Sequence, residues 1–252
     1  MKSIHWLYES EIKTHLNYLS SLKPKRWNVG DVVTFEEGEF VKRGTLTDYG
    51  VRFREDVDDF RGGAFEFKSN GVGVTESSAR ASVGTELAPA EGQSIVSIDF
   101  DRGGAVYLQA TGCRTASLAK LDQLEEKLLR LYATGKWDES RCIVTEVVHC
   151  VRGLTLVAQS KGAAFKATCE FKAGVPQLLG RTGVQNAGES KALFSASLQD
   201  TTPLFSLHRL RKPLFSVPKL QLRGEATAVS ESGGLILAPL EWDDLRAPAE
   251  EL

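Results

Sequence analysis

The segment from Arg141 to Val151 constrains the fold more than any other part of the sequence. It reads Arg-Cys-Ile-Val-Thr-Glu-Val-Val-His-Cys-Val, is rich in β-branched residues, and is long for a strand of a globular protein. Other strand-like runs, separated by glycines and short polar turns, are predicted at 32–35, 40–46, 51–53, 64–68, 94–100, 105–110, 154–158, 163–171, 191–198 and 204–210. The chain is therefore expected to be rich in strands.

Two segments have helical periodicity instead. Ile12, Leu16 and Leu19 are spaced along one face of a predicted helix from Glu9 to Leu22. Leucines recur every three or four residues between Ser117 and Thr134, which predicts a second, amphipathic helix. Together these patterns predict an α+β fold, a twisted and mainly antiparallel central sheet with peripheral helices.

No pattern of residues points to catalysis. Gly71-Val-Gly73 lacks the third glycine of a dinucleotide-binding loop. Cys142 and Cys150 share one face of the predicted strand, but about 26 Å separates them at about 3.3 Å per residue. One metal ion cannot bridge that distance, and His149 lies on the opposite face. We therefore expect no enzyme, no catalytic residue, no metal and no cofactor, and we interpret the cysteines as structural.

The last 29 residues, Gly224 to Leu252, differ in composition from the rest. They hold seven acidic residues and one basic residue, a net charge of −6. The whole chain has a net charge of −2, so residues 1–223 carry 30 Lys and Arg against 26 Asp and Glu, a net charge of +4. A loose stretch, 224–234, precedes an apolar cluster formed by Leu235, Ile236, Leu237, Leu240 and Trp242. This arrangement suits a restraint joined to a basic body by a cleavable linker.

A basic run, His208-Arg-Leu-Arg-Lys212, ends the last strand predicted before that tail. One interpretation is a solvated strand end. The other is contact with anionic lipid headgroups through His208, Arg209, Arg211 and Lys212, where each basic side chain contributes about 1 kcal/mol. Nucleic acid is not expected as a partner, since the chain is not strongly basic and has no motif that reads bases.

The sequence around Cys142-Ile-Val-Thr-Glu-Val-Val148 resembles the bacterial gasdermins, small relatives of the pore-forming domain of animal gasdermins. Val29-Gly-Asp-Val-Val33 and Phe40-Val-Lys-Arg-Gly-Thr-Leu46 are similar to the opening strands of that family. Thr201-Thr-Pro-Leu-Phe-Ser-Leu-His208 resembles its closing strand, and a short C-terminal extension is also a family feature. The resemblance covers residues 27–252 and implies a fold like the gasdermin N-domain.

One family feature is absent from the sequence. Bacterial gasdermins often carry an acylated cysteine among their first residues, whereas the first cysteine here is Cys113. The predicted N-terminal helix, with Trp6 and Tyr8 near it, is the candidate apolar anchor instead.

Membrane insertion would need long hairpins with alternating faces. Two candidates are 64–86 with 94–110 and 141–158 with 163–171. In the first, Ser97 and Asp99 alternate with Val96, Ile98 and Phe100; in the second, Thr155 alternates with its leucine neighbours. The pattern itself also suits permanent strands of a soluble sheet, and it is the resemblance that favours pore formation.

The resemblance implies a latent pore-forming protein in two parts, a pore-forming domain at 1–223 and a linker with an autoinhibitory peptide at 224–252. Cleavage in the linker, with Arg223, Glu225, Glu231 and Gly233 as candidate positions, would release the apolar cluster. The expected partners are an activating protease, membrane lipids and further copies of the chain. The resting protein is expected in the cytoplasm, and the active pore in the inner membrane, where it kills the cell as an antiphage defence. The alternative is a soluble β-rich binding or scaffold module whose acidic tail docks a partner.

Overall fold

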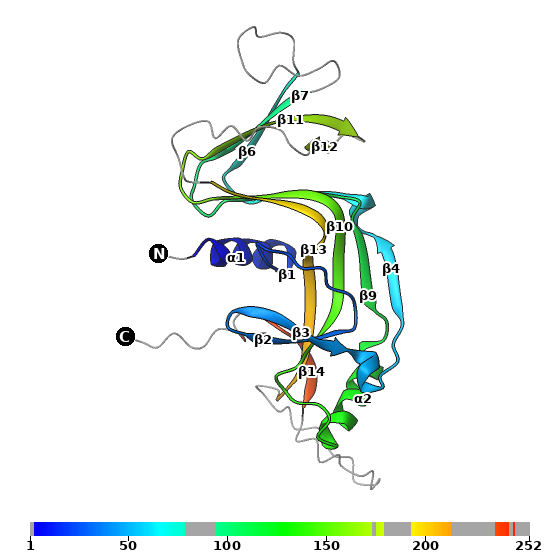
Figure 1. The fold of residues 1–252 in the computed structure, drawn as a ribbon. Coiled ribbons are helices and arrows are strands. Elements are labelled where there is room, and N and C mark those ends of the chain that lie inside the picture. The colour runs from blue at the N-terminus through cyan, green and yellow to red at the C-terminus, as the bar shows by residue number, and fades with distance from the viewer. Residues whose placement is uncertain are drawn as a thin grey trace, which may run out of the picture. The chain divides into compact units, whose positions relative to one another are not determined.

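The computed structural model describes residues 3–78, 94–172, 175–178, 193–212, 235–241 and 244 (Figure 1). Its fold is α+β, as predicted: antiparallel strand pairs dominate, and the described residues contain two α-helices. The elements in chain order are α1 (Ile4–Leu16), β1 (Leu19–Ser20), β2 (Asp31–Glu36), β3 (Glu39–Thr45), the 3₁₀ helix η1 (Leu46–Tyr49), β4 (Glu55–Asp59), the 3₁₀ segment η2 (Phe60–Gly63), β5 (Ala64–Lys68), β6 (Val72–Ser78), β7 (Ser94–Phe100), β8 (Val106–Thr111), β9 (Arg114–Leu118), α2 (Leu121–Ala133), β10 (Cys142–Ala158), β11 (Ala164–Lys172), β12 (Val175–Leu178), β13 (Leu193–Arg211) and β14 (Ile236–Pro239).

The chain forms two compact units, each assembled from three separate segments. Unit 1 comprises Met1–Arg26, Asp59–Arg114 and Val148–Leu204, and unit 2 comprises Trp27–Asp58, Thr115–Val147 and Phe205–Leu252. The long strands β10 and β13 each contribute residues to both units. The predicted boundary between a body at 1–223 and a tail at 224–252 marks the expected cleavage region and is not a boundary between these two units. It stays a prediction.

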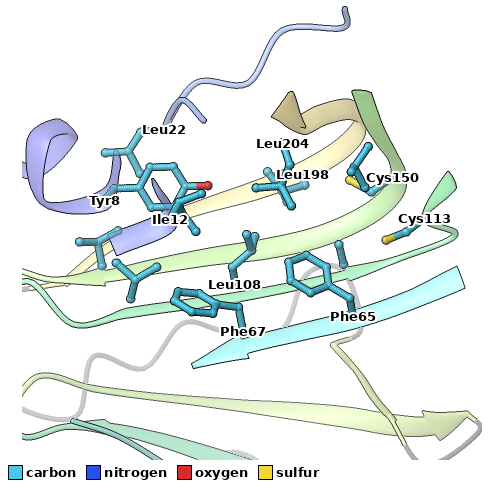
Figure 2. Close-up of a cluster of buried hydrophobic side chains, with 14 residues drawn as sticks. Tyr8, Ile12, Leu22, Phe65, Phe67, Leu108, Cys113, Cys150, Leu198 and Leu204 are labelled. Atoms are coloured by element: carbon cyan, nitrogen blue, oxygen red, sulfur yellow. The ribbon is translucent and has the colours of Figure 1, made fainter. Parts of the chain in front are cut away.

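In unit 1 a sheet built from β5, β8 and the second half of β10 has α1 on one face. β8 pairs with β10 from Val106↔Val157 to Thr111↔Arg152, and with β5 on its other side. Alternate residues of these strands form an apolar cluster with Tyr8 and Ile12 of α1, which Figure 2 shows together with Phe65, Phe67 and Leu108. Since α1 covers this face, both sides of the helix–sheet contact are buried.

A second sheet in unit 1 has the strand order β12-β11-β7-β6. Val96, Ile98 and Phe100 of β7 are buried, whereas Ser97 and Asp99 on the other face are not. The buried residues form a second apolar cluster with Tyr107 of β8 and Leu156 of β10. The alternation predicted for β7 is therefore confirmed, and its apolar face is covered by the neighbouring sheet.

The first helix lies earlier in the sequence than predicted. Ser3 caps α1, because its Oγ accepts a hydrogen bond from the backbone N–H of Trp6, and the helix ends where Asn17 adopts a left-handed conformation with φ 59°. The prediction of Glu9 to Leu22 was wrong at both ends, since Leu19 belongs to β1. The apolar spacing continued past the point at which the backbone leaves the helix.

The second predicted helix begins later than expected, because 114–118 form strand β9 and α2 starts at Leu121. Leu124 and Leu128 are its buried residues, which agrees with the predicted apolar stripe. In the same unit β2 pairs with β3, and Val32 and Val33 of β2 pair with Ile143 and Cys142 of β10.

Strand β10 is continuous over 17 residues, although the sequence suggested a break near Gly153. A Cβ atom at Gly153 would lie 2.3 Å from the carbonyl oxygen of Gln109, so glycine permits the close approach of β8. In this structure 141–158 does not form a hairpin with 163–171, since β11 pairs with β7 and β12. The hairpin expected for membrane insertion stays a prediction. The hydrogen bond from the Gly162 N–H to the Phe100 carbonyl oxygen directs the chain into the second sheet.

Candidate functional site: the tail strand on β13

Strand β14 of the tail pairs with the end of β13 in unit 2 (Figure 1). The pairing is antiparallel and runs from His208↔Pro239 to Arg211↔Ile236. One further backbone hydrogen bond, 2.9 Å from the Leu240 N–H to the Leu207 carbonyl oxygen, extends the contact. The tail thus adds a short strand along the basic run of β13.

The tail segment buries part of the predicted apolar cluster. Leu235 and Leu240 are buried, Leu237 is half-buried, and Ile236 is 38 % exposed. Trp242 lies outside the described residues. At about 1.5–3 kcal/mol for each fully buried large side chain, the two buried leucines contribute several kcal/mol to docking.

Helix α2 borders the tail strand on its other side. A carboxylate oxygen of Glu125, Oε2, accepts a hydrogen bond of 2.9 Å from the backbone N–H of Leu237. The outer groups of an edge strand otherwise face solvent without a protein partner. Leu124 and Leu128 anchor this part of α2 in the core, so Glu125 is held in place to receive the strand.

Two arginines of β13 converge on a single tail carboxylate. Because side chains alternate along a strand, Arg209 and Arg211 share one face. Their guanidinium nitrogens lie 3.3 and 3.4 Å from Oδ1 of Asp244, and the three side chains are 24 %, 32 % and 21 % exposed. Asp244 is held by a local turn, since its Oδ2 also accepts the backbone N–H of Glu241 at 3.0 Å. Among the described side chains, two arginines thus meet one carboxylate at a half-buried strand edge.

The other two residues of the basic run differ from these arginines. Nδ1 of His208 lies 2.8 Å from the hydroxyl of the buried Thr145, and burial lowers the pKa of His208 below its ordinary value. Its ring is accordingly neutral near pH 7. Lys212, at the end of the run, is exposed. Contact of these four side chains with a membrane stays a prediction.

The candidate cleavage positions Arg223, Glu225, Glu231 and Gly233 lie outside the described residues. The described chain stops at 212 and resumes at 235, next to the docked strand. Cleavage there stays a prediction.

Three of the cysteines are packing residues. Cys113, Cys142 and Cys150 are free and buried. Burial raises the pKa of Cys113 to about 12 and that of Cys142 to about 11, so both thiols are protonated at neutral pH. Within the described ranges, no group of three or more His, Cys, Asp and Glu side chains is placed to hold a metal ion. Neither α1 nor α2, the helices of the described chain, is long and apolar enough to cross a membrane.

In the sequence, Asp244 was noted only for its contribution to the net charge of the tail, and neither Ala238 nor Glu125 was predicted to belong to the site. Ala238 is buried, and its two-residue spacing from Leu240 is a strand signal that would have found it. Glu125 and Asp244 carry no such signal, because their partners are distant in sequence.

No protein-family model and no curated protein matches the sequence. Among solved structures, the chain is similar to the one described as the cryo-EM structure of the Gasdermin A3 membrane pore. That match covers 86 % of this chain and 93 % of the other, at 15 % sequence identity and a TM-score of 0.35. Values this low carry no argument about function, which has to be built on the residues of this chain.

Proposed function

We propose that this chain is a latent pore-forming protein of the gasdermin type, activated when its C-terminal peptide is cut away. The observation that carries the proposal is the docking of β14, a strand of the acidic tail, on the basic edge of β13. Next to this strand, Asp244 of the tail meets Arg209 and Arg211. The sequence resemblance to bacterial gasdermins supplies the activity that such a restraint would hold back.

Features of unit 1 support the role of the body. A strand that crosses a bilayer in a barrel needs about 9–11 residues with alternating faces. Strand β7 has that alternation, and the stretch from the start of β6 at Val72 to the end of β7 at Phe100 is long enough for two such strands and a turn. In the proposal, the apolar face of β7 exchanges its contacts with Tyr107 and Leu156 for contacts with lipid.

The strength of tail docking suits a latch that depends on its tether. Two buried leucines and a four-residue ladder contribute several kcal/mol. Association of a free peptide costs about 4–15 kcal/mol in lost translational and rotational freedom. The tethered tail therefore stays bound, whereas a cut tail dissociates at micromolar protein concentrations. Its loss also changes the net charge of the remaining chain from −2 to +4, which favours anionic membranes.

The proposal includes an activating protease, membrane lipids and further copies of the chain as partners. The resting protein is placed in the bacterial cytoplasm. Cleaved copies oligomerise into β-barrel pores in the inner membrane and kill the cell, as an antiviral defence.

The test replaces residues 225–230 with the recognition sequence of a site-specific protease. Cutting this full-length variant should release dye from liposomes containing anionic lipid and produce large oligomers in detergent. The matched control carries a scrambled sequence at the same positions and receives the same protease, and it should stay silent.

The opposite result has a definite interpretation. If the cut protein leaks neither anionic nor neutral liposomes and stays monomeric or dimeric in detergent, pore formation is wrong. The alternative of a soluble binding module with an acidic docking tail would then account for the same tail contact.

A further inference from the structure

A hollow in unit 2 lies where β9 ends, β4 begins and α2 starts (Figure 1). We propose that it is a binding site for a small aromatic anion, a molecule with a flat apolar body and one carboxylate or phosphate group. The hollow has a volume of about 530 Å³, within the range of about 300–1,000 Å³ that is typical of small-molecule sites. This inference goes beyond the proposed function and depends neither on the tail nor on pore formation.

Two hydrogen bonds frame the hollow. The backbone N–H of Ala119 donates to the carbonyl oxygen of Arg54 at 3.0 Å, which holds the end of β9 against the start of β4. Lys120 then adopts a left-handed conformation, with φ 59°, and turns the chain into α2. From the second turn of that helix, Nζ of Lys127 donates to the carbonyl oxygen of Arg52 at 2.9 Å. The chain before β4 is thus tied both to β9 and to α2, and the small side chain of Ala119 lines the space that remains.

The floor of the hollow is apolar. Leu118 and Leu124 line it and are 8 % and 5 % exposed. Phe53 also lines it and is half-buried. Such a surface binds a flat ring by the hydrophobic effect and, at Phe53, by contact between aromatic rings. An inorganic anion would leave this apolar surface in contact with water, so the ligand needs an organic body.

The rim of the hollow is basic. Among the described residues that line it, four exposed cationic side chains, Arg52, Arg54, Lys120 and Lys127, stand against one carboxylate, Asp56, a net charge of +3. Nε of Arg54 lies 3.5 Å from Oδ1 of Asp56, but the two side chains are 83 % and 59 % exposed, so water weakens this pair. The rim therefore favours an anionic group on the ligand, and a guanidinium group can also lie flat against an aromatic ring.

The same features argue against two other kinds of partner. A metal cation would meet four positive side chains and a single carboxylate, whereas hard cations need several oxygen ligands. A membrane surface could contact the basic rim, but Leu118 and Leu124 are too deeply buried to reach into a bilayer. A small molecule is the partner that uses both the floor and the rim.

The test uses the intact, uncut chain and anilinonaphthalene sulfonate, a fluorescent aromatic anion. Its fluorescence should rise to saturation as it binds. Naphthoate and naphthyl phosphate should displace it, and neutral naphthol should need at least about a fivefold higher concentration, because it lacks the charge that the rim recognises. Displacement by naphthoate alone assigns the site to carboxylates, displacement by naphthyl phosphate alone assigns it to phosphates, and displacement by both assigns it to aromatic anions in general.

Two variants test the rim and the space separately. Arg54→Gln/Lys120→Gln removes two cationic groups and should weaken probe binding about three- to thirtyfold. Lys136→Gln/Lys161→Gln is the matched control, since it removes the same charge from exposed positions outside the hollow and should leave the affinity unchanged. Ala119→Leu keeps every charge, fills part of the hollow and should also weaken binding. Urea denaturation checks that each variant folds as the parent does.

Three results would overturn the proposal. The first is equal probe affinity in the parent and in Arg54→Gln/Lys120→Gln. The second is equal displacement by naphthol and by the two anions, because the probe would then report an apolar surface without charge recognition. The third comes from vesicles of phosphatidylcholine with and without phosphatidylglycerol: if Arg54 and Lys120 govern binding to the anionic vesicles and not to the probe, the rim is a membrane contact. Dye leakage after cleavage enters none of these measurements, so their outcome is independent of pore formation.

Discussion

The two ends of the described chain are held in different ways. Helix α1 inserts the fully buried side chains of Tyr8 and Ile12 into a large apolar cluster of unit 1 (Figure 2). Strand β14 of unit 2 is held by a short ladder, two flanking leucines and half-buried ion pairs. Removing α1 would expose a large apolar cluster to solvent, whereas removing β14 would expose only the edge of β13. The difference makes α1 part of the core of unit 1 and leaves β14 as the more weakly held end, as the proposed release of the tail requires.

The largest expected effect tests this contrast with the same substitution at both ends. Ile12→Ala should lower the free energy of unfolding by about 2–5 kcal/mol, because Ile12 is completely buried. Ile236→Ala should lower it by less than about 1 kcal/mol, since Ile236 is 38 % exposed. Urea denaturation of the intact chain measures both, and equal losses would remove the distinction between the two ends.

Next in size is a substitution within the tail itself. Leu240→Ala should cost about 2–3 kcal/mol of docking, because Leu240 is buried while its N–H bonds to Leu207. The loss should be local: amides of 236–240 should exchange faster, and those of α1 should not. Leu237→Ala, at a half-buried position, is the control and should have a smaller effect. Faster exchange in α1 would contradict the independence of the two regions.

The sequence was informative where periodicity alone decides the outcome. The alternation of Val96, Ile98 and Phe100 with polar residues predicted the buried face of β7, and the leucine stripe predicted the buried face of α2. Both patterns arise from local geometry, in which strand side chains alternate and helical ones recur every three to four residues. The clustering of Leu235 and Leu240 likewise identified the tail as an apolar segment.

Contacts between residues that are distant in sequence could not be predicted from these local patterns. Strand β11 follows β10 after a short turn, yet it pairs with β7, because residues 162 and 163 bond to Phe100. The convergence of Arg209, Arg211 and Asp244 depends on the register between β13 and β14. Register between separate strands is set by packing of the whole unit, which no single stretch of sequence contains.

A medium effect concerns the polar contacts beneath α1. The Ser20 hydroxyl lies 2.8 Å from both the Tyr8 Oη and the Pro203 carbonyl oxygen, and both Ser20 and Tyr8 are buried. Burial also raises the pKa of Tyr8 to about 12, so the phenol stays neutral. Ser20→Ala should cost about 1–3 kcal/mol, since buried polar groups lose partners. Arg211→Gln, at the half-buried tail contact, should cost about 1 kcal/mol or less. Urea denaturation should show a larger loss of unfolding free energy for Ser20→Ala than for Arg211→Gln. The reverse order would mean that the tail contact contributes more to stability than the contacts beneath α1.

The smallest expected effect is a dependence of stability on pH. The units contain matching contacts between β10 and β13: Nδ1 of His149 lies 3.0 Å from the Thr202 hydroxyl in unit 1, and Nδ1 of His208 lies 2.8 Å from the Thr145 hydroxyl in unit 2. Burial lowers the pKa of both rings, and for His149 the nearby positive charge of Arg26 lowers it further.

The sign of this dependence follows from which state binds the proton first. Below about pH 6.5 the unfolded chain takes up protons on these histidines while the folded chain resists. Stability from each neutral ring is therefore complete above pH 6.5 and declines as the pH falls toward the lowered folded pKa. His208→Gln should flatten the pH dependence of tail exchange between pH 7.5 and 5.5, whereas His149→Gln should flatten that of unit 1 amides alone. If His149→Gln changes the tail instead, the two regions titrate as one, and the independent release of the tail would have to be reconsidered.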